Sequence, residues 1–146
     1  MDALRDPKAW RPYVDPDCTF IDDCCEDAAA SWQKCIDSGD KLELCHYQLI
    51  DLPPEVWDLT DLEWLCCGLN HLKTLPVDIR KLTKLKYFDC SDNKLTELPL
   101  EIGYLTNLIE FYCHDNPFEE EFDEDNALEY IKQKLKCRYI KSSSKT

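Results

Sequence analysis

Ten cysteines and three histidines are the residues of this 146-residue chain that could act as nucleophiles or bind a metal. Structural zinc sites use closely paired cysteines, usually with Cys-x2–4-Cys spacing. The densest group of candidate ligands lies in the first third of the chain and comprises Cys18, Cys24, Cys25, Cys35, Cys45 and His46. None of its gaps has the zinc spacing, so the sequence predicts neither a metal nor another cofactor.

Cysteine catalysis is the second chemistry that these residues raise. A thiolate nucleophile needs a base beside it, whereas the histidines are dispersed along the chain at His46, His71 and His114. The chain has three glycines and no glycine-rich phosphate-binding loop. We therefore expect no enzymatic activity, and keep a cysteine-dependent enzyme or metal-binding protein as an alternative.

Composition narrows the remaining classes of function. Acidic residues outnumber basic ones 30 to 17, for a formal net charge of −13, whereas nucleic-acid binding needs clustered Lys and Arg. The sequence has no apolar run of membrane-spanning length and no signal-peptide core in its first residues. We expect a monomer without nucleic-acid or membrane partners, cytoplasmic (in the host cytoplasm if viral), with every cysteine reduced.

The elements that position these side chains follow from an internal repeat of 23 residues. Its clearest marks are three equally spaced pairs, Leu52-Pro53, Leu75-Pro76 and Leu98-Pro99. After each pair comes the pattern Leu-x-x-Leu/Phe-x-Cys-x-x-Asn-x-Leu/Phe, and a degenerate fourth copy begins near Gly39. One copy buries too little apolar surface to offset the ordering of its backbone, so the copies must stack into a continuous core.

Two columns of the repeat have defined structural tasks. Buried cysteine behaves as a small hydrophobe, and the cysteine column contains Cys67, Cys90 and Cys113. An asparagine amide can bond backbone groups where a strand turns away, and the asparagine column contains Asn70, Asn93 and Asn116. The degenerate copy has Tyr47 in that column, so the ladder should begin at Asn70.

The repeated pattern resembles the leucine-rich-repeat family from Gly39 to Phe118. The resemblance implies an α/β solenoid with about four parallel strands on its concave face and short helical or irregular convex segments. The Leu-Pro-x-x-Ile/Val-x-x-Leu half resembles scaffolds that bind small GTPases, and the cysteine column resembles giant-virus repeat proteins. Some bacterial members carry a Cys-x-Asp ubiquitin-ligase nucleophile, which Cys35-Ile36-Asp37 and Cys90-Ser91-Asp92 match, but this chain has no room for that catalytic domain.

Residues 1–38 should form an N-terminal lead-in and capping helix, followed by the repeats at 39–118. Three prolines predict an extended lead-in held by Trp10 and Tyr13. Asp23 is a candidate N-cap and Gly39 a stop signal, which predicts a helix over Cys24–Asp37 with Trp32 at the centre of its apolar stripe.

Residues 119–146 should close the other end of the solenoid. An acidic stretch, Glu119–Asp125, precedes a predicted capping helix over Asn126–Cys137, and Lys141–Thr146 reads as a mobile tail. The acidic stretch is either a solvated helix start or a docking site. The sequence leaves both alternatives open.

The repeat register assigns the residues that face outward from the concave sheet. One outward column is Lys41, Trp64, Tyr87 and Glu110, and the next is Glu43, Cys66, Asp89 and Tyr112. Tyr and Trp are enriched at interface hot spots. The predicted partner-binding residues are therefore Trp64, Tyr87, Tyr112, Cys66 and Asp89, with the adjoining turn residues Leu69, Asp92, His114 and Asp115.

The sequence thus predicts a non-enzymatic module that binds a protein partner, either a basic protein or a small GTPase, through its concave sheet. The aromatics could instead cover one another or be shielded by residues 1–20. An alternative function is that of a structural or virion-associated component without a specific ligand.

Overall fold

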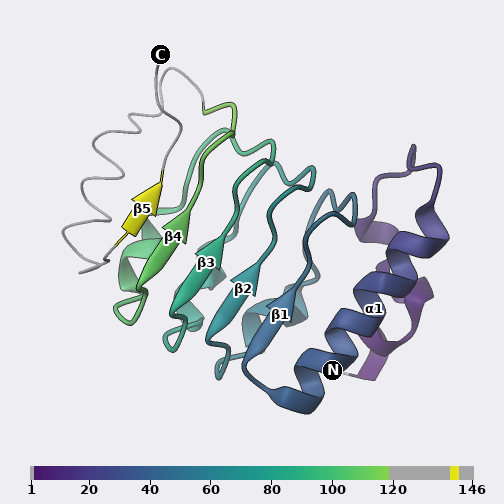
Figure 1. Ribbon diagram of the computed structural model, residues 1–146, viewed down its shortest axis with the longest axis horizontal. Coiled ribbons are helices and arrows are strands. Elements are labelled where there is room, and N and C mark those ends of the chain that lie inside the picture. The colour runs from purple at the N-terminus through teal and green to yellow at the C-terminus, as the bar shows by residue number, and fades with distance from the viewer. Residues whose placement is uncertain (1, 119–138, 142–146) are drawn as a thin grey trace.

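The protein is a curved solenoid whose parallel sheet lines one face and whose N-terminal helix covers one end (Figure 1). The computed structural model describes residues 2–118 and 139–141. Its strands follow one another in sequence order across the sheet: β1 Lys41–Glu43, β2 Trp64–Cys66, β3 Tyr87–Asp89, β4 Glu110–Tyr112 and β5 Tyr139–Lys141. This mixed α/β architecture confirms the predicted fold class.

Each repeat strand pairs with the residues 23 positions further along, as the repeat register requires. Trp64 lies opposite Tyr87, and Leu65 lies opposite Phe88. The number of strands is five where about four were expected, because β5 pairs in parallel with β4. Lys141 is therefore part of the sheet, and its assignment to a mobile tail was wrong. The predicted acidic stretch, the helix at 126–137 and the remaining tail lie outside the described residues.

The convex side of each repeat is a single 3-10 turn. These segments are η3 Pro54–Asp58, η4 Val77–Lys81 and η5 Leu100–Tyr104. Each follows a Leu-Pro pair whose proline is buried or half-buried and takes the N-cap position. A proline at this boundary fixes φ and ends the preceding extended stretch, so the repeated Leu-Pro marks where each convex turn begins.

The apolar columns form one continuous core along the solenoid. Leu65, Phe88 and Phe111 are fully buried, and the rings of Phe88 and Phe111 stack with centroids 5.5 Å apart. The cysteine column is also fully buried. The thiol of Cys67 donates to the carbonyl of Asp89 (3.3 Å) and that of Cys90 to the carbonyl of Tyr112 (3.4 Å), one strand further along.

Helix α1, Ile21–Ser38, covers the open side of the first repeat (Figure 1). Its apolar stripe is buried, and Trp32 has no exposed surface. Gly39 ends the helix in the left-handed conformation (φ 85°) and donates its N–H to the carbonyl of Cys35. The predicted N-cap was wrong: the helix starts after Phe20, because the N–H of Cys24 already bonds the Phe20 carbonyl.

The lead-in is helical, so the predicted extended conformation was wrong. It forms two 3-10 helices, η1 Asp2–Arg5 and η2 Pro7–Tyr13. Asp6 caps η2 by accepting the N–H of Lys8, and a proline suits the first helical position because its φ is already helical. Trp10 is fully buried, donates its indole N–H to the carbonyl of Leu4 (2.8 Å) and meets Trp32 edge to face at 6.3 Å.

Three ion pairs join the second and third copies of the repeat at the same 23-residue spacing. The copy with the acidic partners precedes the copy with the lysines. The pairs are Asp58–Lys81 (3.5 Å), Asp61–Lys84 (2.5 Å) and Glu63–Lys86 (2.6 Å). All six side chains are exposed, so each pair contributes little stability, of the order of 0.2–1 kcal/mol.

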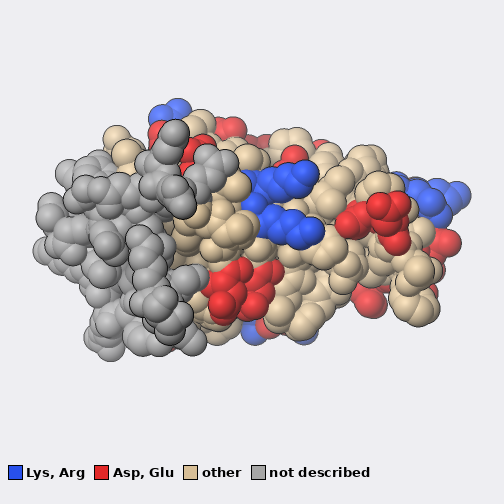
Figure 2. Space-filling model, turned by 90° about the horizontal axis from the view of Figure 1, so that it is seen from above, with Lys and Arg blue, Asp and Glu red and all other residues tan. Residues whose placement is uncertain are grey.

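The surface carries charges of both signs. Figure 2, which views the molecule from above relative to Figure 1, shows separate basic and acidic groups on this face. No helix within the described ranges 2–118 and 139–141 combines the length and apolar character that crossing a membrane requires.

Candidate interaction surface

The concave sheet carries a row of aromatic side chains that the strand register aligns. Trp64 on β2 lies beside Tyr87 on β3, with ring centroids 3.6 Å apart and planes 5° from parallel. Tyr112 on β4 continues the row, with its ring 5.5 Å from Tyr87 and tilted by 44°. All three side chains are half-buried. We call Trp64, Tyr87 and Tyr112 the aromatic strip.

The strip is framed by charged side chains from the same strands. Lys41 Nζ lies 4.8 Å from the centroid of the Trp64 ring, a cation–π contact. The hydroxyl of Tyr112 donates to Glu110 (2.8 Å), and that of Tyr87 reaches Asp89 at 3.5 Å. Lys41 is itself paired with Glu43 on β1 (2.9 Å), so the strip has an ion pair at its β1 end and the carboxylates of Asp89 and Glu110 toward the other.

Partial burial, more than the neighbouring carboxylates, keeps the Tyr87 hydroxyl protonated. Burial, followed by the nearby Asp89, Tyr112 and Glu110, raises the pKa of Tyr87 to about 12. Asp89 is itself held in place, because its Oδ1 accepts the backbone N–H (2.9 Å) and the hydroxyl (2.6 Å) of Ser91. The surface next to the rings is thus fixed in position and negative in potential.

One polar atom of the strip is unsatisfied. Among the described residues, the buried indole N–H of Trp64 has no hydrogen-bond partner. An unpaired buried donor costs about 1–3 kcal/mol. A ligand that placed an acceptor beside this atom after a small rotation of the indole would recover that cost.

The turn residues follow the strands and share an unusual backbone conformation. Leu69, Asp92 and Asp115 occupy one column and have positive φ values of 55°, 52° and 55°. Aspartate tolerates this region, whereas leucine rarely adopts it. Leu69 is also 44% exposed, so it projects an apolar side chain from a strained turn.

The turns after β3 and β4 bring together three side chains that could hold a cation. Asp92 follows β3, whereas His114 and Asp115 follow β4, and the ligand atoms that they offer lie within 4.8 Å of one another. His114 Nδ1 lies 2.6 Å from Asp115 Oδ2, so the imidazole and one carboxylate already satisfy each other. The arrangement is a polar cluster shared by two neighbouring turns.

The asparagines of the repeat hold these turns in place through hydrogen bonds to their backbone. Asn70 donates to the carbonyls of Leu44, Cys67 and Gly68 and accepts the N–H groups of Tyr47 and Leu49. Asn93 and Asn116 repeat the pattern one and two copies on. Each amide therefore ties its own turn to the preceding repeat.

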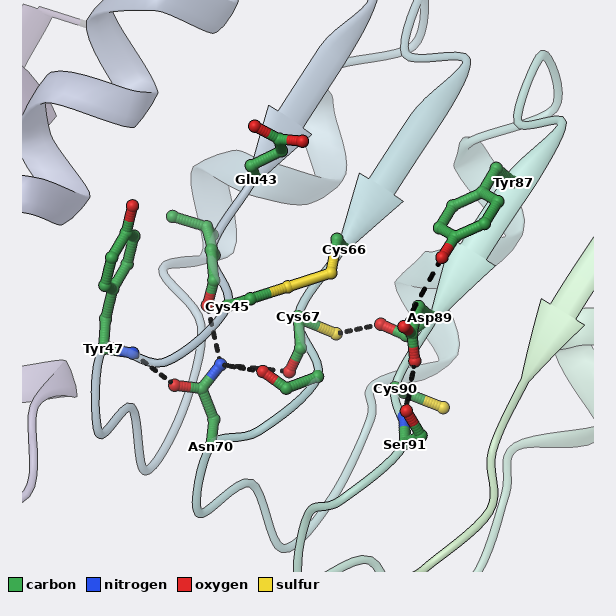
Figure 3. The surroundings of a disulfide bond; sticks show 12 residues. Glu43, Cys45, Tyr47, Cys66, Cys67, Asn70, Tyr87, Asp89, Cys90 and Ser91 are labelled. Atoms are coloured by element: carbon green, nitrogen blue, oxygen red, sulfur yellow. Dashed lines mark hydrogen bonds between the residues drawn. A yellow bond between two sulfur atoms is a disulfide. The ribbon is translucent and has the colours of Figure 1, made fainter.

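Cys66, which the sequence analysis places among the partner-binding residues with a reduced thiol, is not a free thiol in the structure. It forms a disulfide with Cys45, with Cα atoms 6.0 Å apart (Figure 3). The expectation that every cysteine is reduced was therefore wrong. Cys45 lies two residues beyond β1, where the chain bends toward the end of β2, and this bend brings the two Cα atoms into the range that a disulfide can bridge.

Residues separated by 21 positions do not share a column, which is why the repeat alignment missed the pair. A signal was present in the sequence: two cysteines near the strand ends of adjacent copies, both outside the buried cysteine column. The bridge uses Cys45, one of the candidate metal ligands that the sequence analysis considered and set aside, so this thiol is not available to a metal.

Three thiols in the core, those of Cys35, Cys67 and Cys90, are poor candidates for nucleophiles. Burial raises the pKa of Cys35 to about 11 and that of Cys90 well above its ordinary value. Burial also raises the pKa of Cys67, which lies in the same column as Cys90. These thiols are protonated near neutral pH, whereas a nucleophilic cysteine must be a thiolate.

Solved structures of leucine-rich-repeat proteins are similar to this chain. A leucine-rich-repeat protein of Leptospira interrogans shares 33% identity over 68% of this chain and 24% of that one, with a TM-score of 0.60. The functional domain of InlJ from Listeria monocytogenes, described as including a cysteine ladder, shares 23% identity over 71% of this chain and 25% of that one, with a TM-score of 0.53.

The chain spans about a quarter of the length of these two structures. No protein-family model and no curated protein sequence matches it. The structural similarity and the 23-residue stacking of parallel strands together show that this chain has the leucine-rich-repeat fold.

Proposed function

We propose that this protein is a non-enzymatic interaction module that binds a protein partner through its concave sheet. The observation that carries the proposal is the aromatic strip, in which three rings from successive strands form one row. Rings that lie on the outer face of a sheet are not needed by the core below it. Half-buried and mutually stacked, they form a rigid platform that loses little conformational entropy on binding.

The charges around the strip favour a partner with an apolar anchor and basic flanking groups. Asp89 and Glu110 lie beside the rings, and their charges add to the effect of burial in raising the pKa of Tyr87. A Lys or Arg of the partner would pair with these carboxylates and could also stack on a ring. By resemblance alone, the partner class includes small GTPases.

The size of the strip limits what it can bind alone. Strands about 4.8 Å apart, each exposing a few residues, present only a few hundred Å², whereas a standard interface buries about 800 Å² on each partner. The turn residues Leu69, Asp92, His114 and Asp115 enlarge the surface at the strand ends. We propose that they form the rim of the interface and that the module acts as a cytoplasmic monomer.

The test uses the full chain with a photo-crosslinking residue in place of Lys41 to capture and identify a partner. Trp64→Ala and Tyr87→Ala should then each weaken binding of the purified partner by about 1–3 kcal/mol, roughly 5- to 150-fold in Kd. Because the two rings stack on each other, each substitution should also lower the free energy of unfolding by about 0.5–1.5 kcal/mol.

Tyr104 provides the matched control, since it is a tyrosine on the convex segment η5 with 63% of its surface exposed. Tyr104→Ala should leave the affinity unchanged. If the partner ignored the strip variants but was lost on neutralising Glu119–Asp125, the acidic stretch would be the docking site. Equal affinities for all variants would contradict binding through the concave sheet, and failure to capture any partner would favour the structural role without a specific ligand.

A further inference from the structure

A second pair of sulfur atoms lies within reach of bond formation, away from the interaction surface. The Sγ atoms of Cys18 and Cys24 are 3.7 Å apart. Cys18 lies in the turn that links the lead-in to α1, and Cys24 lies in the first turn of the helix. Both residues are half-buried and have free thiols.

Little movement separates this contact from a covalent bond. A disulfide has an S–S distance of about 2.05 Å, so the sulfur atoms must approach by roughly 1.7 Å, which rotation about the Cα–Cβ bond of one side chain can supply. The backbone at Cys18 lies outside α1 and can adjust, whereas the Phe20 carbonyl holds the N–H of Cys24. The helix can thus stay in place while the turn closes on it.

A small oxidant can reach the pair from solvent. An open cavity of about 390 Å³ is lined by Cys18 and Cys24 together with Asp17, His46 and Gln48. Neighbouring Cys25 is 2% exposed and packs into the core. Cys25 lines a separate cavity, with Pro7 and Arg11, so an oxidant in the first cavity meets Cys18 and Cys24 but not Cys25.

A disulfide suits this site better than a metal ion does. Burial, the contact with Cys18 and the nearby Cys25 and Asp27 raise the pKa of Cys24 to about 11. A bound cation would require both sulfurs as thiolates, in a place that penalises negative charge. A disulfide is neutral and removes the ionisable groups altogether, and the chain already holds one disulfide, between Cys45 and Cys66.

We propose that Cys18 and Cys24 form a second, oxidisable disulfide that fastens the lead-in to the first turn of α1. The bond forms by exchange with an external disulfide. One protein thiolate attacks that disulfide and displaces the first external thiolate, giving a mixed disulfide. The other protein thiolate then attacks the protein sulfur and displaces the second. The protein loses two protons and two electrons, and the external disulfide is reduced to two thiols.

The experiment treats the folded full-length chain with oxidised glutathione, blocks remaining thiols with an alkylating reagent and cleaves without reduction on the N-terminal side of aspartate. Asp22 and Asp23 separate Cys18 from Cys24, so their peptides stay together only if a disulfide joins them. We expect the joined peptides after oxidation and both cysteines alkylated before it. Cys24→Ser should abolish the joined species and leave Cys18 as a glutathione adduct.

Cys25→Ala is the matched control, because Cys24 and Cys25 fall on the same peptide. The joined species should persist in this variant. Its loss in Cys25→Ala would assign the bond to Cys25 and overturn the proposal. So would alkylation of both Cys18 and Cys24 in wild-type protein under conditions in which Cys45–Cys66 stays oxidised. This readout is independent of partner binding. A negative result for the disulfide would therefore leave the proposed binding through the concave sheet unaffected, and the reverse also holds.

Discussion

At the scale of residues, the ladder asparagines satisfy the buried backbone groups of the turns. Each ladder asparagine bonds several backbone groups at once, from its own turn and from the repeat before it. Asn93 is buried, so water cannot replace these partners.

Asn93→Ala should therefore lower the free energy of unfolding by about 1–3 kcal/mol, since it leaves the buried N–H of Leu72 without its acceptor. It also removes one of two donors from the carbonyls of Cys67, Cys90 and Ser91. Chemical denaturation of the two purified proteins measures the difference. Asn107→Ala is the control, because Asn107 is exposed and its side-chain amide donates a hydrogen bond to the carbonyl of Thr83. A loss no larger for Asn93 than for Asn107 would contradict the ladder's energetic role.

Residue columns were predictable because stacking converts a sequence period into spatial neighbours. The alignment of Trp64 with Tyr87 follows from their separation of 23 residues. Contacts that cross columns were not predictable in the same way. Cys45 meets Cys66 through the bend after β1, and the stack of two rings that leaves both half-buried depends on rotamers that the sequence pattern does not determine.

At the scale of elements, the N-terminal cover is joined to the repeats by packing, by an isolated bridge and by side-chain hydrogen bonds, one of them from the Ser31 hydroxyl on α1 to the Glu43 carbonyl on β1. Val14 pairs with Leu49 in the bridge, and Asp15 Oδ2 lies 2.8 Å from His71 Nδ1 in the next repeat. The N–H of Asp17, and then His71, lower the pKa of Asp15. The lead-in is thus anchored to two copies of the repeat.

Because the pKa of Asp15 is lower in the folded state than in the unfolded state, the stability of the protein depends on pH. The contribution of its carboxylate is present above the unfolded-state pKa of about 3.9 and is lost as pH falls through the lower folded-state value. Asp15→Asn should consequently destabilise the protein near pH 7 and approach wild-type stability in acid. Denaturant midpoints measured from about pH 7 down to about pH 3 would show the two curves converging.

Repeating the substitution in a His71→Ala background separates the two causes. The difference should shrink without vanishing, because the N–H of Asp17 still bonds the carboxylate. A gap between wild type and Asp15→Asn that stayed constant across this pH range would refute the assignment.

The sequence identified the helix and its buried Trp32 but not the form of the lead-in. Three prolines suggested an extended chain, yet proline is equally suited to the start of a 3-10 helix. The outcome was decided by tertiary contacts, in which Trp10 bonds the Leu4 carbonyl and packs against Trp32. Such contacts join segments with no periodic relation, so pattern analysis could not supply them.

For the whole molecule, the central question is how firmly the first repeat is coupled to the rest. In a solenoid each copy contacts only its neighbours, so an end can fray on its own. The Cys45–Cys66 disulfide opposes this by joining the region after β1 to the end of β2. Disulfides persist in oxidising compartments and are rare in the cytosol, so the proposed cytoplasmic location requires this bond to be protected from reduction.

Reduction of Cys45–Cys66 should lower the free energy of unfolding by about 2–4 kcal/mol, the usual range for a loop of this length. The measurement is denaturation of the oxidised chain with and without reductant. A Cys45→Ala/Cys66→Ala variant serves as the control and should show no response to reductant. If the variant responded as strongly as wild type, another bond would be the stabilising one.

The ion pairs between the second and third copies have a consequence for assembly. Apolar columns are interchangeable, so a copy displaced by one whole repeat, or exchanged with a second molecule, could still bury its leucines. The charges are not interchangeable: Asp58, Asp61 and Glu63 meet lysines only in the next copy, Lys81, Lys84 and Lys86. Although each pair contributes little stability, together they favour the native order of the copies over a displaced or exchanged one. Two copies with acidic side chains at these positions would repel each other if they stacked side by side.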